Sequence, residues 1–173
     1  ALLTTLWYRS MSVATYEKKA WNQVGKEFGI VFNAAPDLVA QGIEELHQTG
    51  GGAVYATEEL SSPDADRSYF VGYMDPQVME LRAVDLLEGS LPQAADEIAV
   101  EQDALRVLFP GATVGDTVTL PSQRGEQYRV VGILEPYQMQ WRALNGSKTF
   151  VNYPPPTILT IPGNQPAQYI HLF

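Results

Sequence analysis

Residues 86–134 decide the fold, and they read LLEGSLPQAADEIAVEQDALRVLFPGATVGDTVTLPSQRGEQYRVVGIL. The stretch begins with an apolar pair and a turn that contains Gly89 and Pro92. An acidic and apolar string over residues 96–100 leads into a helical segment, and two β-prone runs follow over residues 114–120 and 128–134. We therefore expect short strands around one helix, and the stretch contains no group that suggests catalysis.

The two β-prone runs predict a hairpin. Gly115 and Asp116 suit a tight turn, because glycine reaches positive φ without steric cost and an aspartate side chain bonds its nearby backbone. Residues 117–120 then alternate polar and apolar side chains, which is the period of a half-buried strand. Pro121 ends that strand, since it lacks a backbone donor. The polar segment up to Gln127 contains a glycine, so a loop of about four to six residues joins the strands.

Four short motifs stand in order within this stretch. They are Glu88-Gly89 with Pro92, Glu97-Ile98 with Val100, Gly115-Asp116 with Val118 and Leu120, and Val130-Val131-Gly132-Ile133. Their order and spacing resemble the extracytoplasmic core domain of MacB-type, FtsX-like ABC transporter permeases, which carries EG-x-x-P, EI-x-V, GD-x-V-x-L and V-V-G-I as a loose signature. The motifs cover less than a third of the chain, and each of them alone occurs in many β-domains.

The resemblance implies a non-catalytic domain on the extracytoplasmic side of the cell membrane. In that family a separate cytoplasmic ABC ATPase binds the nucleotide, and the outer domain passes on or receives conformational change through helical stalks. Such domains serve lipoprotein extraction, export of peptides or antibiotics, peptide-antibiotic sensing, or control of cell-wall hydrolases. The resemblance also implies a second permease copy or paralogue as a partner. The resemblance further implies an apolar helix directly before Ala1 and another after Phe173.

The flanking sequence predicts further elements. Apolar residues at spacings of three and four make residues 1–22 an amphipathic helix, which is either a stalk above the lipid or a helix packed on its own domain. Residues 25–32 form an expected strand, Pro36 suits the start of a helix, and the glycines at residues 50–52 end that helix. With a second strand over residues 53–57, this is a β-α-β unit.

We expect an α+β fold of two lobes. Residues 1–64 form the first part of a porter-like β-α-β lobe near the membrane, residues 65–150 form a mostly β distal lobe, and residues 151–173 return to the first lobe. Residues 149–152 and 158–161 are expected strands. Residues 168–173 are strongly β-prone and end without a polar stop, so we expect a fragment whose membrane-proximal lobe is truncated.

Composition disfavours several function classes. Twenty acidic residues against eleven basic ones give a formal net charge of −9, which repels nucleic acid and anionic lipid headgroups. The chain has no cysteine, so disulfides, thiolate catalysis and cysteine-bound metals are excluded. Neither a run of about 20 apolar residues nor a signal peptide is visible.

The candidate catalytic and metal-binding residues are few. His47 and His171 are the two histidines, and neither has a second ligand at metal-binding spacing. No serine lies in a G-x-S-x-G elbow, and the adjacent carboxylates are expected to be surface charges. The glycines at residues 50–52 follow a helix instead of preceding one, so they do not fit a phosphate loop. We expect no enzyme activity, no cofactor and no metal.

One irregular segment carries candidate contact residues. Tyr137, Met139 and Trp141 lie close together in the sequence, and Tyr153 stands beside three prolines. Aromatic residues and methionine are enriched at interfaces, so these four residues are candidates for contact with a partner or a ligand. In the alternative interpretation, Trp141 and Met139 fill the gap between the lobes. A contact role predicts that Trp141→Ala leaves stability nearly unchanged, whereas a core role predicts a large loss.

Two other classes of function stay open from the sequence. The first is a secreted or surface-anchored module that binds a glycan or peptide, with Tyr137, Trp141 and Tyr153 recognising the ligand. The second is a hydrolase whose site is assembled from distant residues. Membrane helices on both sides of the chain would distinguish the permease from these alternatives, and an activity screen would test the hydrolase.

Overall fold

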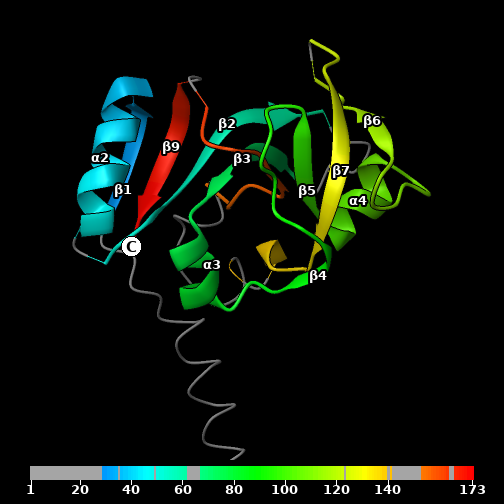
Figure 1. Ribbon diagram of the computed structural model, residues 1–173. Helices are drawn as coiled ribbons and strands as arrows, with labels where there is room; N and C mark the ends of the chain where they lie inside the picture. Colours follow the sequence, from blue (N-terminus) through cyan, green and yellow to red (C-terminus); the bar gives the residue numbers. More distant parts are fainter. Residues whose placement is uncertain are drawn as a thin grey trace, which may run out of the picture.

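We describe the fold from a computed structural model (Figure 1). The structure describes residues 29–34, 36–48, 50–61, 67–122, 124–139, 141, 153–163 and 166–173. The helix predicted for residues 1–22 and the strand predicted for residues 149–152 lie outside these ranges. The first predicted strand, residues 25–32, is described from residue 29 onward.

The described chain forms one mixed sheet with three helices, which confirms the predicted α+β class. The sheet has the strand order β1-β9-β2-β3-β8-β5-β7-β4, and β6 pairs with β7 beside β4. The helices are α2 (Pro36–Gln48), α3 (Pro76–Arg82) and α4 (Gln102–Leu108). The strands are β1 (Gly29–Ala34), β2 (Ala53–Leu60), β3 (Tyr69–Met74), β4 (Leu86–Gly89), β5 (Glu97–Glu101), β6 (Thr117–Thr119), β7 (Gln127–Leu134), β8 (Ile158–Leu159) and β9 (Ala167–Leu172).

The elements β1, α2 and β2 follow one another as the sequence predicted, but a third strand separates β1 from β2. Strand β9 lies between them and is antiparallel to both, so β1 and β2 run parallel. The helix begins at Pro36, as expected, and ends where Gly50 adopts a φ of 76°. The Gly51 N–H then bonds the Leu46 carbonyl at 2.8 Å, which satisfies one of the last free carbonyls of the helix.

The two faces of the sheet are covered by different elements. In β5, Ile98 and Val100 contact the cluster under α4, whereas Ala99 between them contacts the cluster under α3. This alternation is the strand period of two. Helix α2 packs through Ile43 and Leu46 on Ala53, Tyr55, Ala167 and Ile170. Tyr55 pairs with Tyr73, and Tyr73 shares its face of β3 with Val71, which belongs to the cluster under α4. Helix α2 therefore lies on the same face of the sheet as α4.

The four sequence motifs meet on β7. Strand β5, with the EI-x-V motif, lies parallel along one side of β7, while β4 and β6 share its other side. Two glycines allow a close approach of the backbones. A Cβ atom on Gly89, whose φ is 78°, would lie 2.0 Å from the Val131 carbonyl oxygen, and one on Gly132 would lie 2.2 Å from the Ser90 carbonyl oxygen. Gly89 and Gly132 are therefore required by backbone packing.

Alanine at position 132 is expected to lower the free energy of unfolding by about 2–3 kcal/mol, because its Cβ overlaps backbone that cannot rotate away. Gly42→Ala is the matched control. Position 42 is inside α2 with open space around it, and alanine there should stabilise the protein by about 0.5–1 kcal/mol. Urea unfolding measures both. Equal stability of Gly132→Ala and the unmodified chain would contradict the packing described for β4 and β7.

The sheet runs without interruption across the predicted lobe boundary. Strand β2 lies before residue 64 and β3 after it, yet they pair along their length. The return segment joins the first part of the chain through β9, and it also supplies β8, which lies between β3 and β5. The division into residues 1–64, 65–150 and 151–173 as lobes stays a prediction.

Candidate functional site

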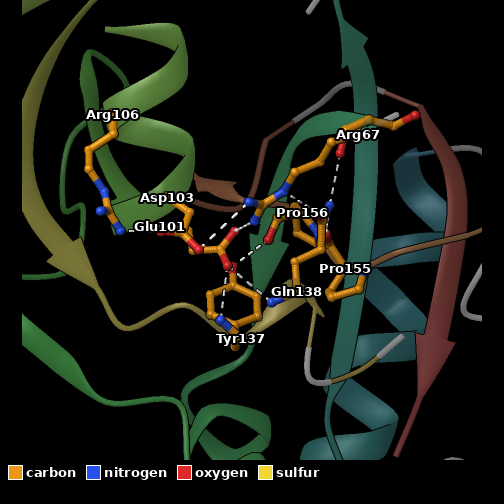
Figure 2. Close-up of polar contacts among 9 residues, drawn as sticks. Arg67, Glu101, Asp103, Arg106, Tyr137, Gln138, Pro155 and Pro156 are labelled. Carbon is orange, nitrogen blue, oxygen red and sulfur yellow. Dashed lines mark hydrogen bonds and ion pairs between the residues drawn. The ribbon is translucent and has the colours of Figure 1, made fainter. Parts of the chain in front are cut away.

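A buried carboxylate at the end of β5 joins distant parts of the chain. Glu101 is 0% exposed. Its Oε2 accepts a hydrogen bond from Arg67 Nη2 at 3.1 Å, and its Oε1 accepts bonds from the backbone N–H groups of Tyr137 at 2.9 Å and Gln138 at 3.2 Å (Figure 2). We call Arg67, Glu101, Tyr137 and Gln138 the Glu101 clasp.

The other members of the clasp extend the network to two more segments. Arg67 Nε donates to Gln138 Oε1 at 3.2 Å, and Gln138 Nε2 donates to the Ser68 carbonyl at 3.0 Å. The Tyr137 hydroxyl donates to the Pro156 carbonyl. The clasp therefore fastens together the start of β3, the end of β5, the segment after β7 and the proline segment before β8 (Figure 2).

The electrostatics of the clasp favour a structural role. Burial raises the pKa of Glu101, and the Arg67 guanidinium acts in the opposite direction, followed by the Gln138 and Tyr137 amides. Burial also raises the pKa of the Tyr137 hydroxyl well above its ordinary value, which keeps that group a neutral donor.

Three donors occupy the two Glu101 oxygens, so this carboxylate holds backbone segments in place.

An aromatic cluster connects the clasp to the end of β9. Trp141 is 2% exposed, and its ring centroid lies 6.0 Å from that of Tyr137 and 6.0 Å from that of Phe173. The Arg82 guanidinium carbon lies 4.3 Å from the centroid of the Trp141 ring and 5.1 Å from that of Phe173, which is cation–π geometry. Phe173 exchanges two backbone hydrogen bonds with Gly52, at 2.9 and 3.0 Å. A continuous set of buried contacts thus runs from Phe173 to Arg67.

The four residues predicted to contact a partner lie in different environments. Tyr137 and Trp141 pack against each other and are each 2% exposed, so their rings face the core. Met139 is 51% exposed. Tyr153 is partly buried and packs on Tyr169, with ring centroids 5.3 Å apart, in a separate cluster. The structure brings together only the first pair, and contact of these residues with a partner or ligand stays a prediction.

The two histidines make structural contacts. His47 Nε2 contacts Asp75 Oδ2, and the other Asp75 oxygen accepts the Gln77 N–H at 3.0 Å as the N-cap of α3. His171 Nε2 lies 2.9 Å from the Tyr153 carbonyl oxygen. Among the described residues, no three histidine, aspartate or glutamate side chains form a group that could hold a metal ion. None of the described helices has the length and apolar character needed to cross a membrane.

Glu97 is expected to contribute to acid sensitivity. The Gln93 N–H bonds its carboxylate at 2.9 Å and lowers its pKa from 4.5, and the Ala94 N–H and Arg129 act in the same direction. A carboxyl whose pKa is lower in the folded state stabilises the protein above its unfolded pKa and loses that contribution as pH falls. Stability should therefore decrease below about pH 4.5, and Glu97→Gln should show a shallower decrease. Urea midpoints between pH 3 and 7 test this, and identical slopes would contradict it.

Comparisons with known proteins agree with the resemblance seen in the motifs. The sequence matches the family described as MacB-like periplasmic core domain over residues 9–168. A comparison with curated proteins found no match. Among solved structures, the chain is similar to the periplasmic region of MacB from Actinobacillus actinomycetemcomitans, with 14% identity and a TM-score of 0.50. That alignment covers 83% of this chain and 72% of the other.

Two more solved structures show weaker likeness. The extracellular domain of the noncanonic ABC-type transporter YknZ from Gram-positive bacteria has 12% identity and a TM-score of 0.46, with 86% of this chain and 83% of that one covered. A domain of a putative permease protein from Porphyromonas gingivalis has 13% identity and a TM-score of 0.45, with coverages of 84% and 62%. The family match spans most of the sequence and includes all four motifs on β4 to β7. The chain belongs to the MacB-like periplasmic core domain family, as its motifs predicted.

Proposed function

We propose that this chain is the extracytoplasmic domain of an FtsX- or MacB-like ABC transporter permease, and that it couples ATP-driven motion to work outside the membrane without catalysing a reaction. The family match over residues 9–168 is the observation that carries this proposal. The site geometry supports it, because the fully buried carboxylate of Glu101 fastens segments of the chain together.

The contacts from Phe173 to Arg67 supply a physical route for such coupling. The buried rings of Phe173, Trp141 and Tyr137 pack one against the next, and the Tyr137 backbone N–H bonds Glu101. Close-packed interiors have few alternative arrangements, so displacement of one member moves its neighbours. A movement transmitted along β9 would therefore reach the clasp, which joins the start of β3, the end of β5 and the segment before β8.

The partners follow from the family. A cytoplasmic ABC ATPase would hydrolyse the nucleotide, and a second permease copy or paralogue would stand beside this one. The cargo or signal would be a peptide, a lipoprotein or an antibiotic. The alternative of a surface-anchored glycan-binding module has less support, because two of its three candidate aromatic residues, Tyr137 and Trp141, are buried.

Cysteine labelling tests the proposed location. The chain has no cysteine, so a single Gln102→Cys substitution at an exposed position gives one labelling site within these 173 residues, and any cysteine elsewhere in the complete gene product is first replaced by serine. A membrane-impermeant maleimide should label it in intact cells as fully as in lysed cells. Ala99→Cys is the matched control, since position 99 is 0% exposed and should react only after unfolding. Labelling of Gln102→Cys only after lysis would contradict the proposal.

A further inference from the structure

A small cleft opens on the sheet face that carries α2 and α4. Its volume is about 180 Å³, well below the roughly 300–1,000 Å³ typical of sites for drug-sized ligands. Tyr55 and Val71 line it from β2 and β3, and the segment after β8 lines it with Ile161. Leu120, Glu126 and Tyr128 come from the β6–β7 hairpin, and Thr57, Glu58, Ala95, Thr160, Pro162 and Gly163 complete the wall. The cleft therefore has the size of one side chain and combines apolar walls with two carboxylates.

A β-bulge in β2 turns Glu58 toward this cleft. Tyr55 pairs with Tyr73 and Ala56 with Gly72, but the next pair is Glu58 with Val71, which leaves Thr57 as the extra residue. Directly paired residues point to the same face, so Glu58 shares the face of Val71. A regular strand would have placed Glu58 on the opposite face.

The bulge is supported by specific contacts. The Thr57 hydroxyl donates to the Val71 carbonyl at 3.2 Å. Position 72 has to be glycine, since a Cβ there would lie 2.0 Å from the Tyr55 carbonyl oxygen. The Thr160 N–H and hydroxyl both bond the Gly72 carbonyl, at 2.8 and 3.1 Å. These contacts fix the backbone of β2, β3 and the residue after β8, which together form part of the cleft.

The cleft is electrostatically negative around Tyr128. The Tyr128 hydroxyl bonds Glu126 Oε2 at 3.1 Å, and its pKa is raised first by burial, then by Glu126 and Glu58. Arg124 lies 3.7 Å from Glu126 and is 66% exposed, so it neutralises this carboxylate weakly. In the part of the chain that the structure describes, no cationic group pairs with Glu58.

We propose that this cleft binds one cationic side chain, a lysine or arginine, of a polypeptide partner or cargo. The charged end would lie between Glu58 and Glu126, and the aliphatic stem would pack on Val71, Leu120 and Ile161. The rings of Tyr55 and Tyr128, which line the cleft, favour a cation as well. The net charge of −9 would increase the rate of encounter with basic peptides. This inference is independent of the proposed permease function, because it concerns binding to the isolated chain.

Titration with small peptides followed by NMR tests the proposal on the 173-residue chain. The probe is N-acetyl-glycyl-lysyl-glycine amide, and the same peptide with norleucine keeps the stem without the charge. Lysine peptide should shift the backbone signals of Tyr128 and Thr160, whereas norleucine peptide should not. Glu58→Gln should weaken the binding by about fivefold or more. Glu59→Gln, which removes the same charge from the neighbouring exposed position paired with Phe70, should leave it unchanged.

Each other outcome would overturn the proposal. Equal shifts with lysine and norleucine peptides would show an apolar site, and absence of shifts at Tyr128 would show no site. If Glu58→Gln and Glu59→Gln lowered the affinity for the lysine peptide equally, the loss would come from the net charge of the chain and not from a contact in the cleft. Equal binding of spermidine, a cation without a peptide backbone, would contradict the assignment to a polypeptide.

Discussion

Replacing Trp141 with alanine should lower the free energy of unfolding by about 3–5 kcal/mol, as expected for a large aromatic side chain removed from a core. Trp141 is 2% exposed and packs against the tilted rings of Tyr137 and Phe173. The substitution would also remove the nearer of the two aromatic rings, Trp141 and Phe173, that lie against the buried Arg82 guanidinium. Urea unfolding of the purified chain measures this loss.

Met139→Ala is the matched control for Trp141→Ala. Met139 lies two residues away but is 51% exposed, so its truncation should change stability by less than about 0.5 kcal/mol. If Trp141→Ala melted within a few degrees of the unmodified chain, the core role of Trp141 would be wrong. The contact role considered for Trp141 from the sequence would then be favoured.

Glu101→Ala should lower the free energy of unfolding by about 3–4 kcal/mol, because it removes one partner of a buried ion pair. Arg67, whose side chain is 13% exposed, would lose its nearer carboxylate and keep the Asp103 carboxylate at 3.7 Å and the hydrogen bond to Gln138. The Tyr137 and Gln138 N–H groups would lose their acceptor in a buried site. Equilibrium unfolding in urea, with the midpoint and slope both fitted, gives the value.

Two further variants separate the contributions of the backbone hydrogen bonds and of the ion pair to the stability loss of Glu101→Ala. Glu101→Gln keeps an acceptor oxygen for the Tyr137 and Gln138 N–H groups, so it should cost less, about 1–2 kcal/mol. Asp103→Asn removes the more exposed carboxylate near Arg67 and should cost less than about 1 kcal/mol. Equal costs for Glu101→Ala and Asp103→Asn would contradict the assignment of Glu101 as the centre of the clasp.

Local patterns predicted most elements of residues 86–134. Strand β5, helix α4 and the β6–β7 hairpin occur where alternation, turn residues and apolar runs indicated them. Alternation, turn residues and apolar runs each involve residues that are close in the sequence, so a periodicity analysis can detect them. Gly89 and Gly115 were recognised as turn residues, but the close approach of Gly89 and Gly132 to the carbonyls of Val131 and Ser90 was visible only in the structure.

Long-range pairing could not be predicted in the same way. Nothing in β9 indicates that it lies between β1 and β2, because an antiparallel partner more than a hundred residues away leaves no local pattern. The same holds for the Glu101 clasp. Glu101 is the last residue of a buried strand, but its burial depends on Arg67 and on the backbone after β7, which come together only on folding.

The environments of the candidate site residues could not be predicted from local sequence patterns either. Tyr137, Met139 and Trp141 were grouped by proximity in the sequence. In the structure, the Trp141 N–H bonds the Tyr137 carbonyl in a helical turn, which buries the two aromatic rings and exposes Met139. Glu58 was interpreted as a surface charge because adjacent strand residues alternate in direction. The bulge at Thr57 changes that alternation, and a bulge has no strong signature in the sequence.

The most direct test of the coupling account uses the complete permease, reconstituted with its ATPase, and a single Met139→Cys as the reporter. Its rate of reaction with an impermeant maleimide is measured without nucleotide and after trapping with ATP and vanadate. We predict that the two rates differ by about fivefold or more, and that Glu101→Gln reduces the difference while ATP hydrolysis continues. The same rate in both states of the unmodified permease would contradict the account.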